Sequence, residues 1–330
     1  MKLDEKTKTP DSEARDGTET PSKTVASTKK TRSKCRKWTK RISITLAVLT
    51  VSAVGLYIGW YLWRQYEPIE QNVPPNYTEL FGKLDAVLSD GTDHPIDDAL
   101  RTARKTLLHI HKNVHDYTAV MSKQLRIDGE LLPVKTMFAK IRNRKMSNSQ
   151  QIVTPLSVYL RFSGGSEVIW VEGRNGGKLL FHNPGFLKVV LPVPPLDPRG
   201  KPAMMGNRKP ISEIGVENLM VELVKQGLNE RKLAAADCVV VKDANALKEG
   251  RRCTMFEIRH PRRLPGMEFY FARIYIDNVL HVPFFYEAFT WPDTEGGEPL
   301  LTDRYTYADI KLNVNLTEMD FDPENEDYDF

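Results

Sequence analysis

The stretch "PLSVYLRFSGGSEVIWVEGRNGGKLLFHN", residues 155–183, decides the class of fold. Apolar and polar residues alternate along it, and glycine turns at 164–165 and 173–177 divide it. Such alternation is typical of strands with one buried face, and tight turns between successive strands make the strands antiparallel. The stretch therefore predicts part of a one-sided antiparallel sheet. Its three predicted strands are Leu156–Phe162, Glu167–Glu172 and Lys178–His182.

The glycine cluster Gly173–Lys178 has a second interpretation, a phosphate-binding loop. Such a loop has the pattern G-x-x-x-x-G-K-[ST], and it opens a helix whose N-terminus attracts the phosphate. Here the spacing is one residue short, and Leu179 stands where the hydroxyl should be. The apolar run that follows ends in an Asn-Pro-Gly turn at 183–185, which indicates a strand. The cluster is therefore interpreted as a hairpin turn.

The alternating pattern extends on both sides of this stretch. Asp128-Gly129, between two alternating segments, is a strong hairpin signal. The proline-rich segment Leu191–Pro210 interrupts the pattern and predicts a long loop. Five further strand-like runs are expected near Asp237–Lys242, Cys253–His260, Phe269–Ile276, Phe284–Trp291 and Leu301–Asn313.

Helical periodicity appears between the strands. From Pro95 to Val114 apolar residues recur every three or four positions, and two aspartates follow Pro95 closely. A second apolar stripe follows Ser212, a favourable N-cap residue. A shorter helical piece is expected at Leu80–Leu88. Together with the strands, these helices predict an α+β domain built on an antiparallel sheet.

The N-terminal part differs in composition from the rest. Residues 1–41 are rich in charged and hydroxyl residues, which predicts a disordered basic tail. The next 22 residues, Ile42–Trp63, carry no charge, which is long enough for a transmembrane helix. Basic residues precede this segment and acidic ones follow it, so the tail is expected to be cytoplasmic.

The predicted organisation is therefore a tail at 1–41, a transmembrane helix at 42–63, a linker at 64–92 and an exported domain at 93–330. A cleavable signal peptide is the alternative, but the apolar stretch is long and no small-x-small cleavage site follows it. The expected location is the inner membrane, with the folded domain in the periplasm.

Cys238 and Cys253 are the cysteines of the predicted exported part, and each lies in an apolar segment. With "ANALKEG", residues 244–250, taken as the turn between their strands, antiparallel pairing is expected to place the two cysteines opposite each other or nearly so. In an oxidising compartment this arrangement predicts a disulfide, and the alternative is two buried thiols.

The segments "MFAKIR", "PLSVYLRF" and "EVIWVEGRNGGKLLFHNPG" resemble the periplasmic lipoprotein-carrier family. The chain as a whole, from Pro95 to Phe330, is similar to a bacterial domain family of unknown function, through "MMGNRKPISEIGVENL", "VPFFYEAFTWP" and the C-terminal segment. The carrier resemblance implies a strongly curved, incomplete antiparallel barrel, with helices plugging its concave face and an apolar cavity for acyl chains.

The carrier resemblance also implies ligand-binding residues. Carriers have an arginine where this chain has Tyr159, and Arg161, two residues on, is the substitute candidate. Asn207, Arg208 and Glu213 form either the polar rim of a cavity or a loop-to-helix junction in which Arg208 pairs with Glu213. The candidate ligand-binding residues are Tyr159, Arg161, Trp170, Met204, Met205 and Arg208.

The sequence does not favour catalysis or metal binding. It contains neither G-x-S-x-G nor H-E-x-x-H. His109, His111 and His115 are expected to diverge, and the acidic residues after Glu318 are expected to be a solvated tail without bound calcium. No cofactor and no nucleic-acid partner are expected. The predicted partners are a lipid or lipoprotein acyl chain and the inner membrane; the alternative is an interaction or sensory module that binds an envelope protein and has a filled interior.

Overall fold

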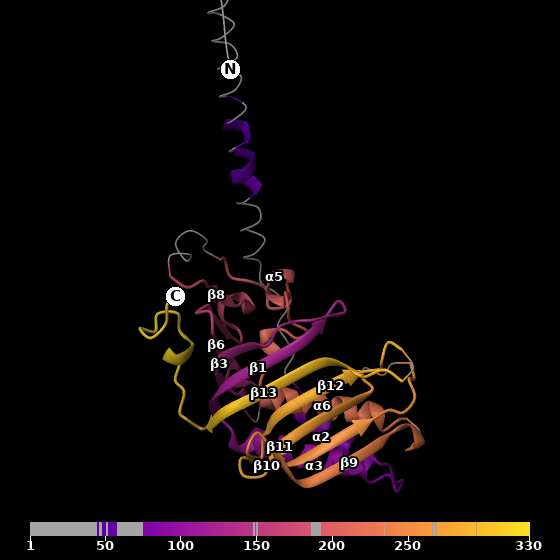
Figure 1. Ribbon diagram of the computed structural model, residues 1–330. Helices are drawn as coiled ribbons and strands as arrows, with labels where there is room; N and C mark the ends of the chain where they lie inside the picture. Colours follow the sequence, from indigo (N-terminus) through magenta and orange to yellow (C-terminus); the bar gives the residue numbers. More distant parts are fainter. Residues whose placement is uncertain are drawn as a thin grey trace, which may run out of the picture. The chain divides into compact units, whose positions relative to one another are not determined.

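Antiparallel strands dominate the computed structural model (Figure 1). It describes residues 75–330 except 148, 150, 186–192, 234, 266, 268 and 295, together with 45, 48–50 and 52–57. The chain divides into the units Met1–Tyr61 and Leu62–Phe330. The predicted tail and most of the predicted transmembrane helix Ile42–Trp63 lie outside the described residues. Within the described residues, no helix has both the length and the apolar character needed to span a membrane.

In the described part of the second unit, 11 strands form one antiparallel sheet with the order β8-β7-β6-β3-β1-β13-β12-β11-β10-β9, and β2 pairs with β1. Strands β8 and β9 are its two edges, so the sheet is not closed. The strands are β1 (Asp116–Ile127), β2 (Glu130–Leu131), β3 (Lys135–Arg142), β6 (Ser157–Phe162), β7 (Glu167–Val171), β8 (Leu180–His182), β9 (Val239–Lys248), β10 (Arg251–Arg259), β11 (Phe271–Asp277), β12 (Pro283–Thr290) and β13 (Leu300–Leu312). Strands β4 (Lys145–Met146) and β5 (Ile152–Thr154) form a separate ribbon.

The turns of the sheet form where the sequence predicts them. Asp128 and Gly129 both have positive φ, at 49° and 84°, as a two-residue hairpin turn requires. Gly173, Asn175 and Gly176 are also left-handed, around the short 3-10 helix η1 (Arg174–Gly177). Strand β8 follows η1, so the glycine cluster is a turn between strands, as predicted.

Three helices pack on one face of the sheet: α2 (Tyr77–Leu88), α3 (Asp97–Asn113) and α6 (Val216–Glu230) (Figure 1). Helices α3 and α6 approach closely at Gly227, where an added Cβ would lie 2.7 Å from the Leu100 side chain. A fourth, short helix, α5 (Lys201–Met204), lies in the loop before α6.

The start of α6 corrects the sequence prediction. Ser212 does not cap it but lies in the preceding 3-10 turn η2 (Ile211–Glu213). The N-cap residue is Gly215, and the N–H of Val216 donates to the hydroxyl of Tyr117 on β1 at 2.9 Å. The sheet itself therefore supplies the acceptor that a cap side chain would otherwise provide.

The cysteines also correct a prediction, because both are free buried thiols. Strand β9 continues to Lys248, so the turn is Glu249-Gly250 and not the whole of 244–250. Cys253 therefore lies opposite Ala246, while Cys238 precedes β9, at the other end of the hairpin. The predicted disulfide between Cys238 and Cys253 is not formed.

The acidic C-terminal segment was predicted to be a solvated tail, and the structure corrects this prediction. It packs on the sheet face opposite the helices, where Phe321 and Tyr328 join a cluster with Tyr159. The rings of Tyr159 and Tyr328 stack at 4.1 Å. Asp320 pairs with Lys140 at 2.7 Å, and this ion pair lowers the pKa of Asp320 although burial opposes the shift. The basic residues of β3 therefore hold the segment in place.

Candidate functional site

A cavity of about 1170 Å³ lies between the helix-covered face of the sheet, helix α6 and the loop that precedes it. Sites for small molecules are usually roughly 300–1,000 Å³, so this cavity has room for a ligand of that size or larger. Much of its lining is apolar and comes from β1, β3, β6, β7 and α6. Its lining includes Met121, Leu125, Met137, Leu160, Val168 and Leu219.

Strand alternation brings these side chains to one face. Met121 and Leu125 are an even number of residues apart on β1, so both point to the same side of the sheet. Met137 on β3 lies directly opposite Met121 in the strand register. Leu160 and Phe162 continue the same apolar face on β6. The alternation that predicts the sheet thus also gives the cavity its apolar floor.

The loop between β8 and α6 forms another wall. Val193, Pro202 and Met205 of this loop line the cavity. The backbones of Leu196 and Leu179 exchange two hydrogen bonds of 2.9 Å, which tie the loop to the sheet edge. Met205 is 78% exposed although it lines the cavity, so it lies where cavity and solvent meet.

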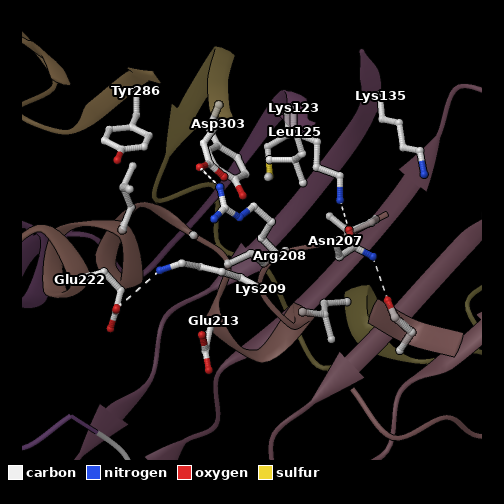
Figure 2. Close-up of a pocket in the computed structure, with 18 of the residues that line it drawn as sticks. Lys123, Leu125, Lys135, Asn207, Arg208, Lys209, Glu213, Glu222, Tyr286 and Asp303 are labelled. Atoms are coloured by element: carbon white, nitrogen blue, oxygen red, sulfur yellow. Dashed lines mark hydrogen bonds and ion pairs between the residues drawn. The ribbon is translucent and has the colours of Figure 1, made fainter. Parts of the chain in front are cut away.

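Two lysines face the cavity from neighbouring strands. Lys123 on β1 lies opposite Lys135 on β3, and both line the cavity. The ammonium of Lys123 donates to the side-chain oxygen of Asn207 in the loop (Figure 2). Burial, and then the charge of Lys135, lower the pKa of Lys123 to about 8. The site therefore holds a partly desolvated cation beside a second cation.

The carboxylates in the described lining have basic partners. Asp303 pairs with Arg208 at 2.5 Å (Figure 2). Burial raises the pKa of Asp303, and Arg208 opposes this shift. Glu222 contacts Lys225 at 2.9 Å and Lys209 at 3.5 Å, and these lysines lower its pKa although burial opposes them. Acids and bases outside the lysine pair therefore largely neutralise one another.

The loop residues Arg208 and Glu213 do not pair with each other, which corrects the predicted loop-to-helix junction. Arg208 reaches Asp303 on β13, and Glu213 pairs with Arg199 at 2.6 Å. Asn207, Arg208 and Glu213 all line the cavity, as the polar-rim interpretation requires. The ion pair of Arg208 with Asp303 holds the loop against the sheet.

The structure divides the sequence-predicted ligand residues between two faces of the sheet. Met205 and Arg208 line the cavity, and Met204 is the adjacent end of α5. Trp170 is buried in the core, and its indole N–H donates to the Gly177 carbonyl at 2.9 Å. Tyr159 and Arg161 lie on the opposite face, Tyr159 in the cluster that the C-terminal segment covers.

The position of Tyr159 has a physical reason. On β6, Val158 and Leu160 belong to the core beneath the helices, so the residue between them points away from it. Its hydroxyl donates to Glu167 at 2.5 Å on the neighbouring strand. Arg161 shares this face and lies over the ring of Phe138. Neither side chain lines the cavity.

The histidines near the end of α3 are spread over different surroundings. His111 contacts Glu217 of α6 at 2.9 Å, whereas His109 packs against His281. Over the described part of the chain, no group of three or more histidine, cysteine or acidic residues is arranged to hold a metal ion.

Lys123 and Lys135 were not among the residues predicted from the sequence. The sequence pattern could have identified Lys123, because strand alternation places it at an inward position between Met121 and Leu125. A lysine in an otherwise apolar inward series is unusual, since buried charges cost free energy unless they are paired. The register that brings Lys135 opposite Lys123 could not be read from the Asp128-Gly129 turn, because β3 is shifted by one residue relative to β2. The turn alone would place Val134 opposite Lys123.

Comparison with known proteins identifies a family and several solved structures with low overall similarity. A family described as a protein of unknown function, DUF1571, matches residues 114–330. No curated protein sequence matches the chain.

Among solved structures, MucB is 11% identical, with a TM-score of 0.35 over 68% of this chain and 62% of that chain. The chain thus spans less than two thirds of the length of MucB. A DUF1329 family protein from Desulfovibrio piger is 9% identical, with a TM-score of 0.32 over 70% of this chain and 98% of that one. A LolA superfamily protein from Nitrosomonas europaea is 10% identical, with a TM-score of 0.26 over 67% of this chain and 96% of that one.

Proposed function

The chain belongs to the DUF1571 family, and we propose that its folded domain binds the acyl chain of a lipid or lipoprotein in the cavity beneath the loop. The observation that carries the proposal is the cavity of about 1170 Å³ with its largely apolar lining. Met121, Met137 and Leu160 form a floor that contacts hydrocarbon favourably. The sheet is proposed to curve around the ligand as an incomplete barrel, with the helices closing its concave face.

The energetics fit a long hydrocarbon chain. Burial of an acyl chain contributes about 0.8 kcal/mol per CH₂ group, so a chain of roughly sixteen carbons contributes on the order of 12 kcal/mol. Association and ordering cost about 4–15 kcal/mol, and the cost is lowest where the site already exists. Because the strands and α6 already form the cavity in the absence of ligand, binding requires little further ordering of the protein.

The alternative function is an interaction module with a filled interior. The two halves of the sheet differ in how fully their interiors are packed, and this difference bears on the choice between the two functions. Beneath β10 and β11, Phe256, Ile274 and Ile276 pack against the helices, and the pocket that they line has a volume of about 50 Å³. This half has the dense interior of an ordinary protein core. The half that contains β1, β3 and β6 is not filled in this way, which favours a ligand there.

We propose binding rather than catalysis for this site. Asp303, Glu213 and Glu222 each form an ion pair with an arginine or lysine. A carboxylate that acts as a general base instead needs a free lone pair within reach of the substrate and a pKa near the working pH. The paired carboxylates are better suited to holding the walls of the cavity together.

We also propose that Ile42–Trp63 anchors the chain in the inner membrane, with residues 1–41 in the cytoplasm and the folded domain in the periplasm. The uncharged stretch and the basic residues before it support this orientation. Alkaline phosphatase fused after Glu70 should be active, because this enzyme folds only after export. An inactive fusion that is produced in normal amounts would contradict the orientation.

A cavity-filling substitution tests the proposed binding. Val168 lines the cavity and is buried, so Val168→Trp should occupy the space of the acyl chain. Val153→Trp is the control, since Val153 lies on β5 and is 65% exposed. Uptake of a fluorescent fatty acid by the full chain should fall about tenfold with Val168→Trp and stay unchanged with Val153→Trp. Equal uptake by both variants would contradict binding in this cavity.

A further inference from the structure

A row of polar side chains crosses the apolar floor of the cavity on four neighbouring strands. Lys135 on β3 lies opposite Lys123 on β1, and Lys123 lies opposite Tyr305 on β13. Tyr305 in turn lies opposite Tyr286 on β12. All four residues line the cavity, and Figure 2 shows Tyr286 and Lys135 on opposite sides of it. The strand register therefore assembles two ammonium groups and two phenols in one line.

Among the residues that the structure describes, the two lysines have no acidic partner. In the described part of the chain, neither Lys123 nor Lys135 forms an ion pair, although Asp303, Glu213 and Glu222 also line the cavity. Each of these acids contacts a different arginine or lysine. Like charges directly opposite each other on adjacent strands are destabilising. Two adjacent ammonium groups that destabilise the protein and have no acidic partner among the described residues are the arrangement expected at an anion-binding site.

The loop holds both lysine tips near its backbone. Asn207 accepts the hydrogen bond from Lys123, and its own amide group donates to the Ala203 carbonyl at 2.8 Å. At Gly206 an added Cβ would lie 3.1 Å from the ammonium of Lys135. Gly206 also has a φ of 69°, which glycine adopts without strain. The loop thus positions the lysine pair at the side of the cavity where Met205 is open to solvent.

Burial keeps the neighbouring phenol in its protonated form. The pKa of Tyr305 is raised, first by burial and then by the charge of Asp303. A protonated phenol is a hydrogen-bond donor, and an ammonium offers only donors. Lys123, Lys135 and Tyr305 therefore present donors that suit the oxygen atoms of a carboxylate or phosphate.

We propose that Lys123, Lys135 and Tyr305 bind the negatively charged head group of the ligand, so that the ligand is an anionic amphiphile with a carboxylate or phosphate next to its acyl chain. This inference rests on the proposed function, because the acyl chain occupies the same cavity. The head group neutralises the lysine pair, while the hydrocarbon lies on Met121, Met137 and Leu160. A neutral lipid of the same chain length leaves the two cations unpaired.

Photo-crosslinking with three probes tests the inference on the full chain held in phosphatidylcholine nanodiscs. The probes share a sixteen-carbon chain with a diazirine at its far end, and they differ only in the head group: carboxylate, phosphate monoester or alcohol. Labelled peptides are mapped by mass spectrometry, and labelling is titrated with each probe. Charge-assisted hydrogen bonds contribute about 1.5–3 kcal/mol, so at least one anionic probe should bind about 10- to 100-fold more tightly than the alcohol. The stronger of the two identifies the head group as carboxylate or phosphate.

The variant Lys123→Met/Lys135→Met should lose this preference and bind the three probes equally. Lys135→Met alone should weaken the preference without affecting folding, because Lys135 is exposed. Lys135→Arg should retain it, since the charge is kept. Lys311→Met, at an exposed position near the end of β13, is the matched control and should leave the preference unchanged.

The outcomes separate the inference from the proposed function. Equal labelling of the cavity by all three probes in the wild-type chain would overturn the head-group site and leave acyl binding intact. A preference for an anion that survives both lysine substitutions would overturn the assignment to Lys123 and Lys135. If none of the probes labels the cavity, the proposed function itself fails, and the head-group site fails with it.

Discussion

Lys123 has an energetic cost in the unliganded protein, and this cost can be measured. Its pKa in the folded state is about 8, below the ordinary lysine value of 10.5, because burial and the charge of Lys135 disfavour its charged form. A lysine with a lowered pKa destabilises the fold most below the folded pKa. The destabilisation disappears as the pH rises from about 8 towards the pKa of the unfolded chain. The unliganded protein should therefore gain stability from Lys123 deprotonation between about pH 8 and 10.5.

Lys123→Met should consequently stabilise the unliganded protein, by about 1–3 kcal/mol near pH 7. Loss of the hydrogen bond to Asn207 keeps the gain below the value that the pKa shift alone gives. The advantage should shrink towards pH 10. Chemical denaturation at several pH values measures it, with Lys311→Met as the control. A clear loss of stability in Lys123→Met at pH 7 would contradict this account of the site.

Two helical glycines should respond in opposite ways to alanine. In α6, Gly227→Ala places a Cβ 2.7 Å from the buried side chain of Leu100, so the α3–α6 contact must shift. In α2, Gly82→Ala meets nothing within 4 Å. Alanine is the better helix former by about 1 kcal/mol, so Gly82→Ala should stabilise the protein. Gly227→Ala should lower the free energy of unfolding by about 1–3 kcal/mol despite that preference. Stabilisation by both substitutions would contradict the close helix approach.

The strands of the sheet could be predicted because the signals for strands and turns are local in the sequence. Alternation marks β6 and β7, and the Asp128-Gly129 pair specifies its turn within two residues. The start of α6 was not predictable, since the acceptor for its first N–H comes from Tyr117, which lies 99 residues earlier in the chain. The cysteine pairing failed for a similar reason. A strand longer than expected moved the turn to Glu249-Gly250 and shifted the register.

The loop before α6 should control how quickly the ligand leaves. Met205 lines the cavity and is exposed, so it is expected to cover the ligand at the end of the cavity where the head group lies. Met205→Ser should raise the dissociation rate of a bound fatty acid about fivefold, because Met205 is 78% exposed without ligand and covering the ligand would bury only part of its side chain. Full burial of a methionine would contribute about 1.5–3 kcal/mol. Val279→Ser, at an equally exposed position, is the control. Equal dissociation rates for the two variants would show that the loop is not a lid.

At the scale of the domain, one open sheet supports two different interiors. Beneath β10 and β11 the side chains fill the space, whereas beneath β1, β3 and β6 a cavity remains. Sequence patterns predict which residues point inward, and they do so for both halves. They do not specify whether side chains of the sheet contact those of the helix and loop, because this depends on the distance between the sheet, the helix and the loop. For this reason the cavity became apparent only in three dimensions, although the strand alternation already placed Lys123 at an inward position.

Native mass spectrometry of the full chain, extracted gently from membranes of the expressing cells, detects bound lipid without a probe. The wild-type chain should carry one lipid, and Val168→Trp, which fills the cavity, should carry almost none. Val153→Trp should carry as much lipid as the wild-type chain. A wild-type chain without bound lipid, or equal lipid on the wild-type chain and Val168→Trp, would contradict a lipid-binding cavity.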